Sequence, residues 1–163
     1  MKQTLLSLLS KPSATHYLLL AFLVLAFLGF LDSTYLTILH YKNSFPPCSF
    51  AHGCETVLTS RYATFFGIPI ALLGSGFYLV IMALVGVLLQ NPVSTDRHGL
   101  SGLAMTKNIP SFLLLLTTLG LFTAIFLVYL QAFVIHAFCQ YCLASEMIDF
   151  LLFDCSWWLW RKH

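Results

Sequence analysis

Two cysteines three residues apart, Cys139 and Cys142, are the residues of this sequence best suited to chemistry. At the start of a helix this spacing places their side chains about one turn apart, close enough to alternate between a dithiol and a disulfide. The first amide groups of a helix carry partial positive charge, which favours the thiolate of Cys139. A second pair, Cys48 and Cys54, lies earlier in the chain. Two such pairs predict thiol–disulfide chemistry at a membrane surface, since the rest of the chain is largely apolar.

Two other interpretations of the cysteines stay open. A zinc site needs four nitrogen or sulfur ligands, which the four cysteines supply, with His52 or His136 as substitutes. The spacing of the earlier pair and a membrane surface exposed to oxidant argue against zinc. A purely structural disulfide in the earlier pair leaves the later pair without a role. Cys155 lies on the same helix as Cys142, ~20 Å further along it at about 1.5 Å per residue, and cannot reach the two pairs. We therefore interpret it as a small apolar core residue.

The composition predicts an integral membrane protein. Of the 163 residues, 59% are hydrophobic and 9% are charged, and the mean hydropathy is +0.87. These values lie outside the soluble globular range. A net charge of +2 is too small to suggest binding to nucleic acid. The length gives room for a single membrane domain, 1–163.

We predict an all-α integral membrane fold, a bundle of four transmembrane helices with a short amphipathic interfacial helix in the first outer loop. The long apolar runs set the spans at about 17–41, 67–89, 109–136 and 140–160. The outer loop is 42–66 and the cytoplasmic connector is 90–108. We expect the interfacial helix over Glu55–Phe66, because Val57, Leu58 and Tyr62 then share one face.

Lysines and arginines orient this bundle. Lys42 and Arg61 fall in the outer loop. The other six lie on the side of the termini: Lys2, Lys11, Arg97, Lys107, Arg161 and Lys162. The positive-inside rule therefore puts both termini in the cytoplasm and both cysteine pairs in the periplasm or an equivalent lumen, where disulfides persist.

Four motifs follow one another in the chain: Cys48-x5-Cys54, Glu55-Thr56-Val57-Leu58-Thr59-Ser60-Arg61-Tyr62-Ala63, Gly67-Ile68-Pro69-Ile70-Ala71-Leu72-Leu73-Gly74 and Cys139-x-x-Cys142. In this order they resemble the vitamin K epoxide reductase family, specifically its bacterial homologues, over about residues 20–150. The resemblance implies a four-helix bundle around a quinone, either ubiquinone or menaquinone, as the substrate, and no metal. It also implies that Cys48 and Cys54 are shuttle cysteines, that Cys54 exchanges with Cys139, and that Cys142 lies nearest the quinone. Ser60 matches the serine that follows the second loop cysteine.

The resemblance also suggests a partner and a location. Many bacterial members carry a fused thioredoxin-like domain, whereas this sequence stops at His163. We therefore expect a separate thioredoxin-like, DsbA-like protein in the periplasm as the thiol donor. The expected location is the bacterial cytoplasmic membrane, with the membrane quinone pool as the second partner and no nucleic acid.

Acidic and aromatic residues in the spans are further candidates for the site. Asp32 falls near the middle of the first span, where an ionised carboxylate costs at least ~2.5 kcal/mol. It either supplies a proton to the reduced quinone or ties helices together through hydrogen bonds. Glu146 lies one turn beyond Cys142 and is the alternative proton donor. Four aromatic residues are best placed to wall a quinone pocket: Phe65, Phe66, Phe138 and Tyr141.

The sequence thus predicts an oxidoreductase that passes electrons from a protein dithiol to a membrane quinone and so supplies disulfides to exported proteins. One alternative is reduction of vitamin K epoxide or its quinone with the same cysteines. The disulfide bond protein B family also has four spans and two cysteine pairs, but there the Cys-x-x-Cys comes first in the chain. A non-catalytic membrane protein with a structural disulfide or a zinc site is the alternative from a different class.

Overall fold

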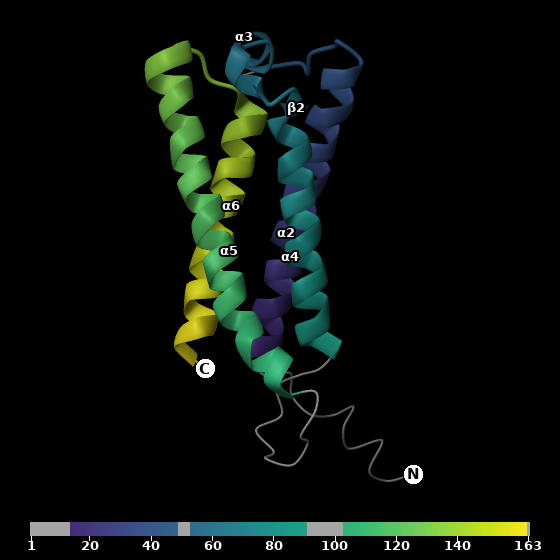
Figure 1. Ribbon diagram of the computed structural model, residues 1–163, viewed down its shortest axis with the longest axis vertical. Helices are drawn as coiled ribbons and strands as arrows, with labels where there is room; N and C mark the ends of the chain where they lie inside the picture. Colours follow the sequence, from purple (N-terminus) through teal and green to yellow (C-terminus); the bar gives the residue numbers. More distant parts are fainter. Residues whose placement is uncertain (1–13, 49–52, 91–102, 163) are drawn as a thin grey trace.

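The computed structural model describes residues 14–48, 53–90 and 103–162. Four long helices run along the same axis (Figure 1). They are α2 (Ala14–Tyr41), α4 (Ile70–Gln90), α5 (Leu103–Tyr129), which continues as the π-helical turn η2 (Leu130–Ile135), and α6 (Gln140–Lys162). Between α2 and α4 lie α3 (Cys54–Leu58), the 3-10 turn η1 (Arg61–Ala63), β1 (Thr64–Phe65) and β2 (Ile68–Pro69). The short elements gather at one end of the bundle, and α2 begins at the other end, where α6 finishes.

Three of the helices within the described residues are long and apolar enough to cross a membrane: Thr15–Tyr41, Ile70–Leu89 and Asn108–Ile135. Their mean hydropathies are 2.0, 2.4 and 2.4. The fourth helix, α6, has 23 residues and is less apolar because it carries Glu146, Asp149 and Asp154. The predicted four-helix membrane bundle is therefore confirmed, with α6 as its most polar member.

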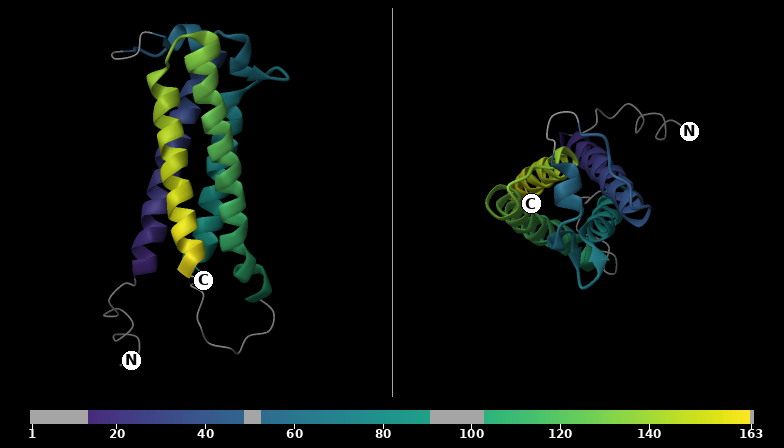
Figure 2. Two further views of the ribbon diagram at one scale, coloured as in Figure 1. Left: turned by 90° about the vertical axis from the view of Figure 1, so that its left-hand side faces the viewer. Right: turned by 90° about the horizontal axis from the view of Figure 1, so that it is seen from above.

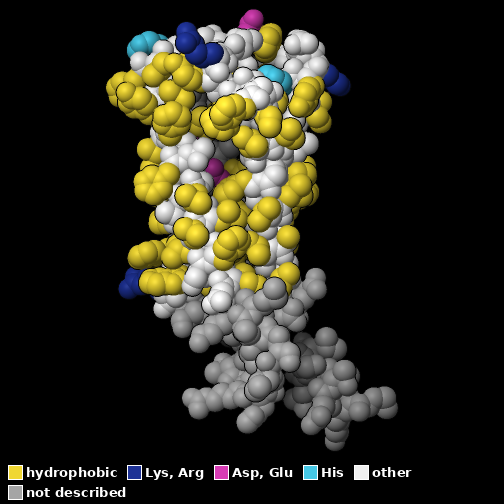
Figure 3. Space-filling model, in the orientation of Figure 1, with side chains coloured by type: hydrophobic (Ala, Val, Ile, Leu, Met, Phe, Trp, Pro, Cys, Tyr) yellow, Lys and Arg dark blue, Asp and Glu magenta, His cyan; other side chains and the backbone are white. Residues whose placement is uncertain are grey.

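The interior of the bundle is closed by apolar side chains from all four helices. Phe22, Ile81, Leu113 and Leu152 are fully buried in one cluster. Large apolar side chains also cover much of the outer surface (Figure 3), as expected of helices whose solvent is hydrocarbon. The short elements and the cysteine pairs lie at the loop end of this apolar bundle.

The loop between α2 and α4 differs from the prediction. The helix expected over Glu55–Phe66 ends at Leu58, because Ser60 is extended (φ −63°, ψ 153°) and breaks the helical hydrogen bonding. A two-residue antiparallel hairpin, β1 with β2, follows, so the fold is not purely helical. Gly67 turns this hairpin with φ +81°, a conformation that glycine adopts without steric cost. The second span consequently begins at Ile70 and not at Gly67.

The third membrane span begins at Asn108, close to the predicted residue 109, but its helix begins before the span. Helix α5 starts at Leu103, inside the predicted connector 90–108, and runs through Pro110. A proline inside a helix removes only one backbone donor, and a long helix tolerates that loss. The rest of the connector, and residues 1–13, lie outside the described residues.

Seen from above the loop end, α3 lies across the middle of the bundle, and the hairpin projects to one side (Figure 2). This placement sets α3, with Cys54 at its first position, beside the turn that joins η2 to α6. The loop cysteines and the Cys-x-x-Cys cysteines are therefore at the same end of the bundle.

Candidate redox site

The two loop cysteines form a disulfide. Cys48 follows the coil after α2, Cys54 begins α3, and their Cα atoms are 6.3 Å apart. The two sulfur atoms are not equally accessible, because Cys48 is half-buried whereas Cys54 is 2% exposed. A reagent from water therefore reaches this disulfide from the Cys48 side.

Gly53 brings the loop disulfide against the second cysteine pair. A Cβ atom at Gly53 would lie 2.8 Å from the Cβ of Ala137, 2.8 Å from the backbone nitrogen of Phe138 and 2.9 Å from its carbonyl oxygen. Real Cβ atoms essentially never approach so closely, so the contact requires glycine. The close approach lets Cys54 and Val57 pack with Cys139 in one small buried cluster.

The second pair, Cys139 and Cys142, lies at the start of α6, and its two cysteines do not form a disulfide. Cys139 is completely buried in the turn before the helix, and Cys142 lies in its first turn. The Cys142 backbone N–H points at the Cys139 sulfur, 3.5 Å away. The hydrogen bond from the Cys142 side chain, helped by backbone N–H groups of Tyr141 and Cys142, lowers the pKa of Cys139 to about 7 against the opposing effect of burial. The direction agrees with the thiolate preference expected at the start of a helix.

Gln131 links the turn at Cys139 to an acid on α6. Its side-chain oxygen accepts the backbone N–H of Cys139 at 2.9 Å, and its side-chain nitrogen donates to Glu146 Oε1, also at 2.9 Å. The π-helical turn and the left-handed conformation of His136 (φ 54°) let the chain reverse so that Gln131 faces the turn. The other carboxyl oxygen of Glu146, Oε2, is buried without a hydrogen-bond partner among the described residues.

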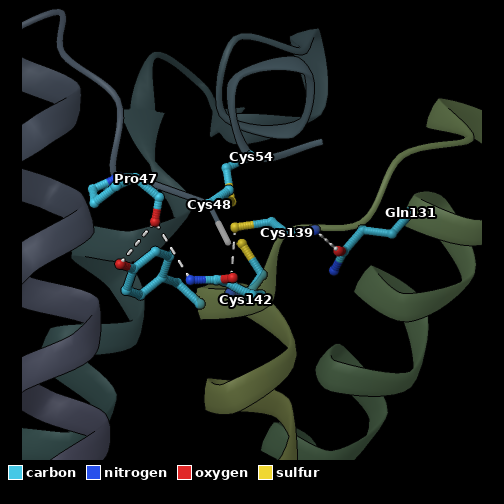
Figure 4. The surroundings of a disulfide bond; sticks show 8 residues. Pro47, Cys48, Cys54, Gln131, Cys139 and Cys142 are labelled. Atoms are coloured by element: carbon cyan, nitrogen blue, oxygen red, sulfur yellow. Dashed lines mark hydrogen bonds between the residues drawn. A yellow bond between two sulfur atoms is a disulfide. The ribbon is translucent and has the colours of Figure 1, made fainter. Parts of the chain in front are cut away.

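The two residues between the later cysteines hold the loop. The Tyr141 hydroxyl and the Gln140 side-chain amide both donate to the carbonyl oxygen of Pro47, at 3.3 and 3.5 Å. Pro47 directly precedes Cys48, and Figure 4 shows the four cysteines of the two pairs gathered between this carbonyl and Gln131. The arrangement fixes the more accessible loop cysteine beside the later pair.

A cavity of about 580 Å³ opens below the loop, between the helices. Its wall is mostly apolar and includes Leu116, Leu119 and Phe77, while Cys142 and Glu146 contribute polar groups. Figure 3 shows acidic side-chain atoms inside a hollow between the helices on one face. Of the four cysteines in the two pairs, Cys142 lines the cavity, whereas Cys139 lies behind it toward the loop.

The structure brings some of the predicted site residues together at this cavity and places others elsewhere. Besides Cys142 and Glu146, the predicted residues in the wall are Ser60 and Phe65. The predicted residues outside the wall are Phe66, Phe138, Tyr141 and Asp32. Phe66 is 91% exposed on the hairpin turn, so it does not wall this cavity in the present conformation. The Ser60 hydroxyl donates to the Val57 carbonyl at 2.7 Å and so closes the end of α3.

Tyr78 and Asp149 are among the polar groups of the wall that sequence reasoning missed. The Tyr78 hydroxyl donates to Asp149 Oδ1 at 2.8 Å, and both side chains line the cavity. Asp32, by contrast, accepts the Ser145 hydroxyl at 2.5 Å, which ties α2 to α6. The sequence feature that could have identified these residues is a polar side chain inside an apolar run, because such a side chain is rare and seldom without a function.

The cavity has the size and lining of a small-molecule site. Its volume lies within the usual range for small-molecule sites, and such sites pair apolar walls with a few polar groups that fix orientation. The unpartnered Glu146 Oε2 supplies a polar group that a bound molecule is able to satisfy. Among the described residues, no three His, Cys, Asp or Glu side chains are grouped as ligands of a metal ion.

Comparison with known proteins gives two findings. A model of the vitamin K epoxide reductase family matches residues 20–157, a range that contains both cysteine pairs. The protein named thiol-disulfide oxidoreductase LTO1 from Arabidopsis thaliana is 33% identical over 133 residues, which cover 77% of this chain and 32% of that protein. The chain therefore spans about a third of the length of this relative.

Proposed function

The chain belongs to the vitamin K epoxide reductase family and is an oxidoreductase of membrane helices, and we propose that it is a quinone-dependent thiol oxidase. In this proposal electrons pass from a thioredoxin-like dithiol to the loop pair, then to the Cys-x-x-Cys pair, and then to a membrane quinone. The outcome is a disulfide in the donor. The activity that the relative's name describes, thiol–disulfide exchange, is consistent with the first part of this path.

One observation carries the proposal, namely the change in surroundings from sulfur to sulfur. Cys48 is half-buried at the water side, Cys54 is 2% exposed, Cys139 is fully buried, and Cys142 lines the cavity. A protein dithiol cannot enter the bilayer and a quinone cannot leave it, so a chain of exchanging sulfurs is needed to join them. The first cysteine of this order, Cys48, is accessible to a protein dithiol, and the last, Cys142, is accessible from the cavity.

In the first half of the reaction, a thiolate of the partner attacks the Cys48 sulfur, because Cys48 is the accessible member of the loop disulfide. The Cys48–Cys54 bond breaks and Cys54 leaves as a thiolate. The second partner thiol then attacks the mixed disulfide at the partner's own sulfur. The partner leaves oxidised and the loop pair is left as a dithiol.

In the second half, Cys54 attacks Cys139 in a Cys139–Cys142 disulfide, and Cys142 leaves as a thiolate at the cavity wall. Cys48 then attacks Cys54, which restores the loop disulfide and releases Cys139. A leaving thiol with a lowered pKa departs faster, and the pKa of Cys139 is lowered to about 7. The loop disulfide beside a Cys139–Cys142 dithiol in this structure corresponds to the state after this transfer.

A quinone bound in the cavity accepts two electrons and two protons when the later pair returns to a disulfide. We assign proton supply to Glu146 in preference to Asp32, because Glu146 lines the cavity one turn from Cys142 and Asp32 does not line it. Gln131 holds one Glu146 oxygen and leaves the other directed away from any protein partner in the described residues. Asp32 is assigned to the tie between α2 and α6.

The proposed orientation puts the loop end outside the cytoplasm. Six of the eight Lys and Arg residues fall on the side of the chain termini, which favours a cytoplasmic location for that side. We propose the bacterial cytoplasmic membrane as the location, and a thioredoxin-like domain or DsbA-like protein of the periplasm as the donor.

A trapping experiment tests this function. Purified protein that carries both Cys48→Ala and Cys142→Ala is reduced in nanodiscs, mixed with an oxidised thioredoxin-like protein as the oxidant, quenched with acid and digested. The expected product is a Cys54–Cys139 disulfide in the mass spectrum, because the two cysteines that would resolve this linkage, Cys48 and Cys142, are then absent. Cys155→Ala is the matched control, because Cys155 is a free cysteine of the same helix, and it is expected to reduce a soluble quinone at the wild-type rate. Wild-type protein that fails to reduce any quinone with a protein dithiol would refute the proposed function.

A further inference from the structure

Two carboxylic acids line the cavity, and the proposed function uses one of them. Glu146 and Asp149 are three residues apart on α6 and therefore share a face. Glu146 is held by Gln131, and Asp149 is held by the hydroxyl of Tyr78 at 2.8 Å. Each acid thus has its own hydrogen-bonding partner from a different helix.

The packing around Tyr78 shows how closely its hydroxyl is positioned. Tyr78 extends from α4 toward α6, is 2% exposed and also reaches the Ser145 carbonyl at 3.2 Å. Its ring fills the space beside Gly29 on α2, where the Cβ of any other residue would overlap the ring atoms. The backbone of α2 therefore comes close enough to fix the tyrosine against Asp149.

Quinone reduction needs one proton from outside the cysteine pair when Cys139 is a thiolate. Oxidation of a Cys139–Cys142 dithiol releases two electrons and two protons, which is what a quinone consumes. When Cys139 is a thiolate, however, its proton has already gone to water, and the cysteine pair brings only one. The missing proton comes from an acid of the cavity wall, and when Glu146 only relays the proton of Cys142, Asp149 is the other acid in that wall.

We propose that Asp149, held by Tyr78, is a second proton donor of the cavity, an inference that rests on the proposed quinone reduction. Glu146 gives one proton to the quinone and recovers it from the Cys142 thiol as the disulfide forms. Asp149 gives the other proton and remains a carboxylate that accepts the Tyr78 hydroxyl. The two sulfurs supply both electrons, the products are the disulfide and the quinol, and Asp149 regains its proton from water before the next turnover.

The ionisable groups around Asp149 come from three helices. They are Tyr78 from α4, Asp32 from α2, which is joined through Ser145, and Glu146 from α6 itself. The side chains of α5 in the cavity wall are uncharged. Among the described residues no cation lies beside these acids to hold them ionised. The protonated form of Asp149 is therefore favoured, and this form is the one that donates a proton.

The test compares two pairs of variants in nanodiscs, with dithiothreitol as the donor and a short-chain quinone as the acceptor. Asp149→Asn is paired with Asp154→Asn, an exposed acid of the same helix. Tyr78→Phe is paired with Tyr129→Phe, which loses a hydroxyl from a ring that is 53% exposed. We expect kcat to fall about tenfold to hundredfold in Asp149→Asn and several-fold in Tyr78→Phe, with KM for the quinone unchanged and with the controls at the wild-type rate.

Two further readouts separate proton donation from a structural role. In Asp149→Asn, kcat should decline more steeply than in the wild type as the pH rises, because water becomes the remaining proton source, and Asp149→Glu should recover part of the rate. Reduction of the Cys139–Cys142 disulfide by dithiothreitol without quinone, followed by alkylation, should be unchanged. If this quinone-free rate falls in parallel with kcat, the role is structural and the inference is wrong.

The inference and the proposed function fail in different ways. Wild-type protein without quinone reductase activity removes both. Active wild-type protein whose Asp149→Asn variant matches Asp154→Asn at every pH removes only the role of Asp149. If Asp149→Asn does not fold, Tyr78→Phe decides alone, because it removes a single oxygen, and a rate equal to that of Tyr129→Phe overturns the inference.

Discussion

Replacing Gly53 by alanine should disconnect the loop disulfide from the membrane pair without changing either pair. The Gly53 backbone (φ −96°, ψ 7°) is accessible to alanine, so the change acts through contacts alone. The new methyl group would lie 2.8 Å from the Phe138 nitrogen and 2.9 Å from its carbonyl oxygen. These are backbone atoms of the turn before Cys139 and cannot rotate away. Relief therefore requires the loop to lift from the turn.

The size of the effect follows from the cost of overpacking. Inserting a methyl group into a closed contact costs about 1–3 kcal/mol. At about 1.4 kcal/mol per factor of ten, the docked arrangement of the loop becomes roughly 5- to 100-fold less populated. In the proposed path Cys54 exchanges with Cys139 only from the docked arrangement, so the rate of electron transfer from a protein dithiol should fall by the same factor.

The assay measures quinone reduction with two donors in parallel. A thioredoxin-like protein must act through the loop, whereas a high concentration of dithiothreitol reduces the Cys139–Cys142 disulfide directly. We expect Gly53→Ala to lose the first rate and to keep the second. Gly76→Ala is the matched control, since no atom lies within 4 Å of a Cβ at that position. Equal loss with both donors, or an unchanged rate with the protein donor, would refute this reasoning.

Three other predictions concern the groups around the later pair. Alkylation of Cys139 in the dithiol state should increase with pH through a midpoint near 7, because the thiolate is the reactive form above its pKa. Cys142→Ala should move this midpoint upward, because it removes the hydrogen bond that lowers the pKa of Cys139. Mass spectrometry of quenched samples measures both midpoints, and an unmoved midpoint in Cys142→Ala contradicts the assignment. Gln131→Leu leaves both the Cys139 N–H and Glu146 without their hydrogen-bonding partner. We therefore expect the unfolding free energy, measured by thermal melting, to fall by about 2–5 kcal/mol. Gln131→Glu should destabilise the protein less at low pH than at high pH. Tyr141→Phe removes one of two hydrogen bonds to the loop carbonyl and should slow transfer from the protein donor by less than tenfold in the two-donor assay; no change would show that this bond does not hold the loop.

Three of the four long helices in the described residues were predictable because hydropathy alone defines them. Long apolar runs have no other stable state in a bilayer than a helix, so residues such as those of α2 and α4 are assigned correctly without any knowledge of packing. The common location of both cysteine pairs follows from the even number of spans between the loop and the last turn. The hairpin β1–β2 was not predictable, because two-residue strands leave no periodic pattern, and only Gly67 marks the turn.

Side-chain positions around the cavity were less predictable than the helices. In a soluble helix the apolar face indicates the interior, but here both the lipid and the interior are apolar, so an aromatic residue gives no direction. Phe65 faces the cavity while its neighbour Phe66 is 91% exposed, and Tyr141 donates to the loop. The match of Tyr78 to the space at Gly29 depends on helix register, which the sequence does not contain.

The burial of Cys54 and Cys139 bears on how the proposed path avoids a short circuit. A thioredoxin-like protein able to touch Cys139 directly would bypass the loop, and water at that position would let oxidants reach the quinone-side pair. Cys139 is completely buried and Cys54 is 2% exposed, so each is accessible mainly to the other while the loop is docked. Only Cys48 is open to a partner, and only Cys142 lines the cavity. Electrons can therefore enter and leave at opposite ends, and the order of exchange is set by packing as well as by reduction potential.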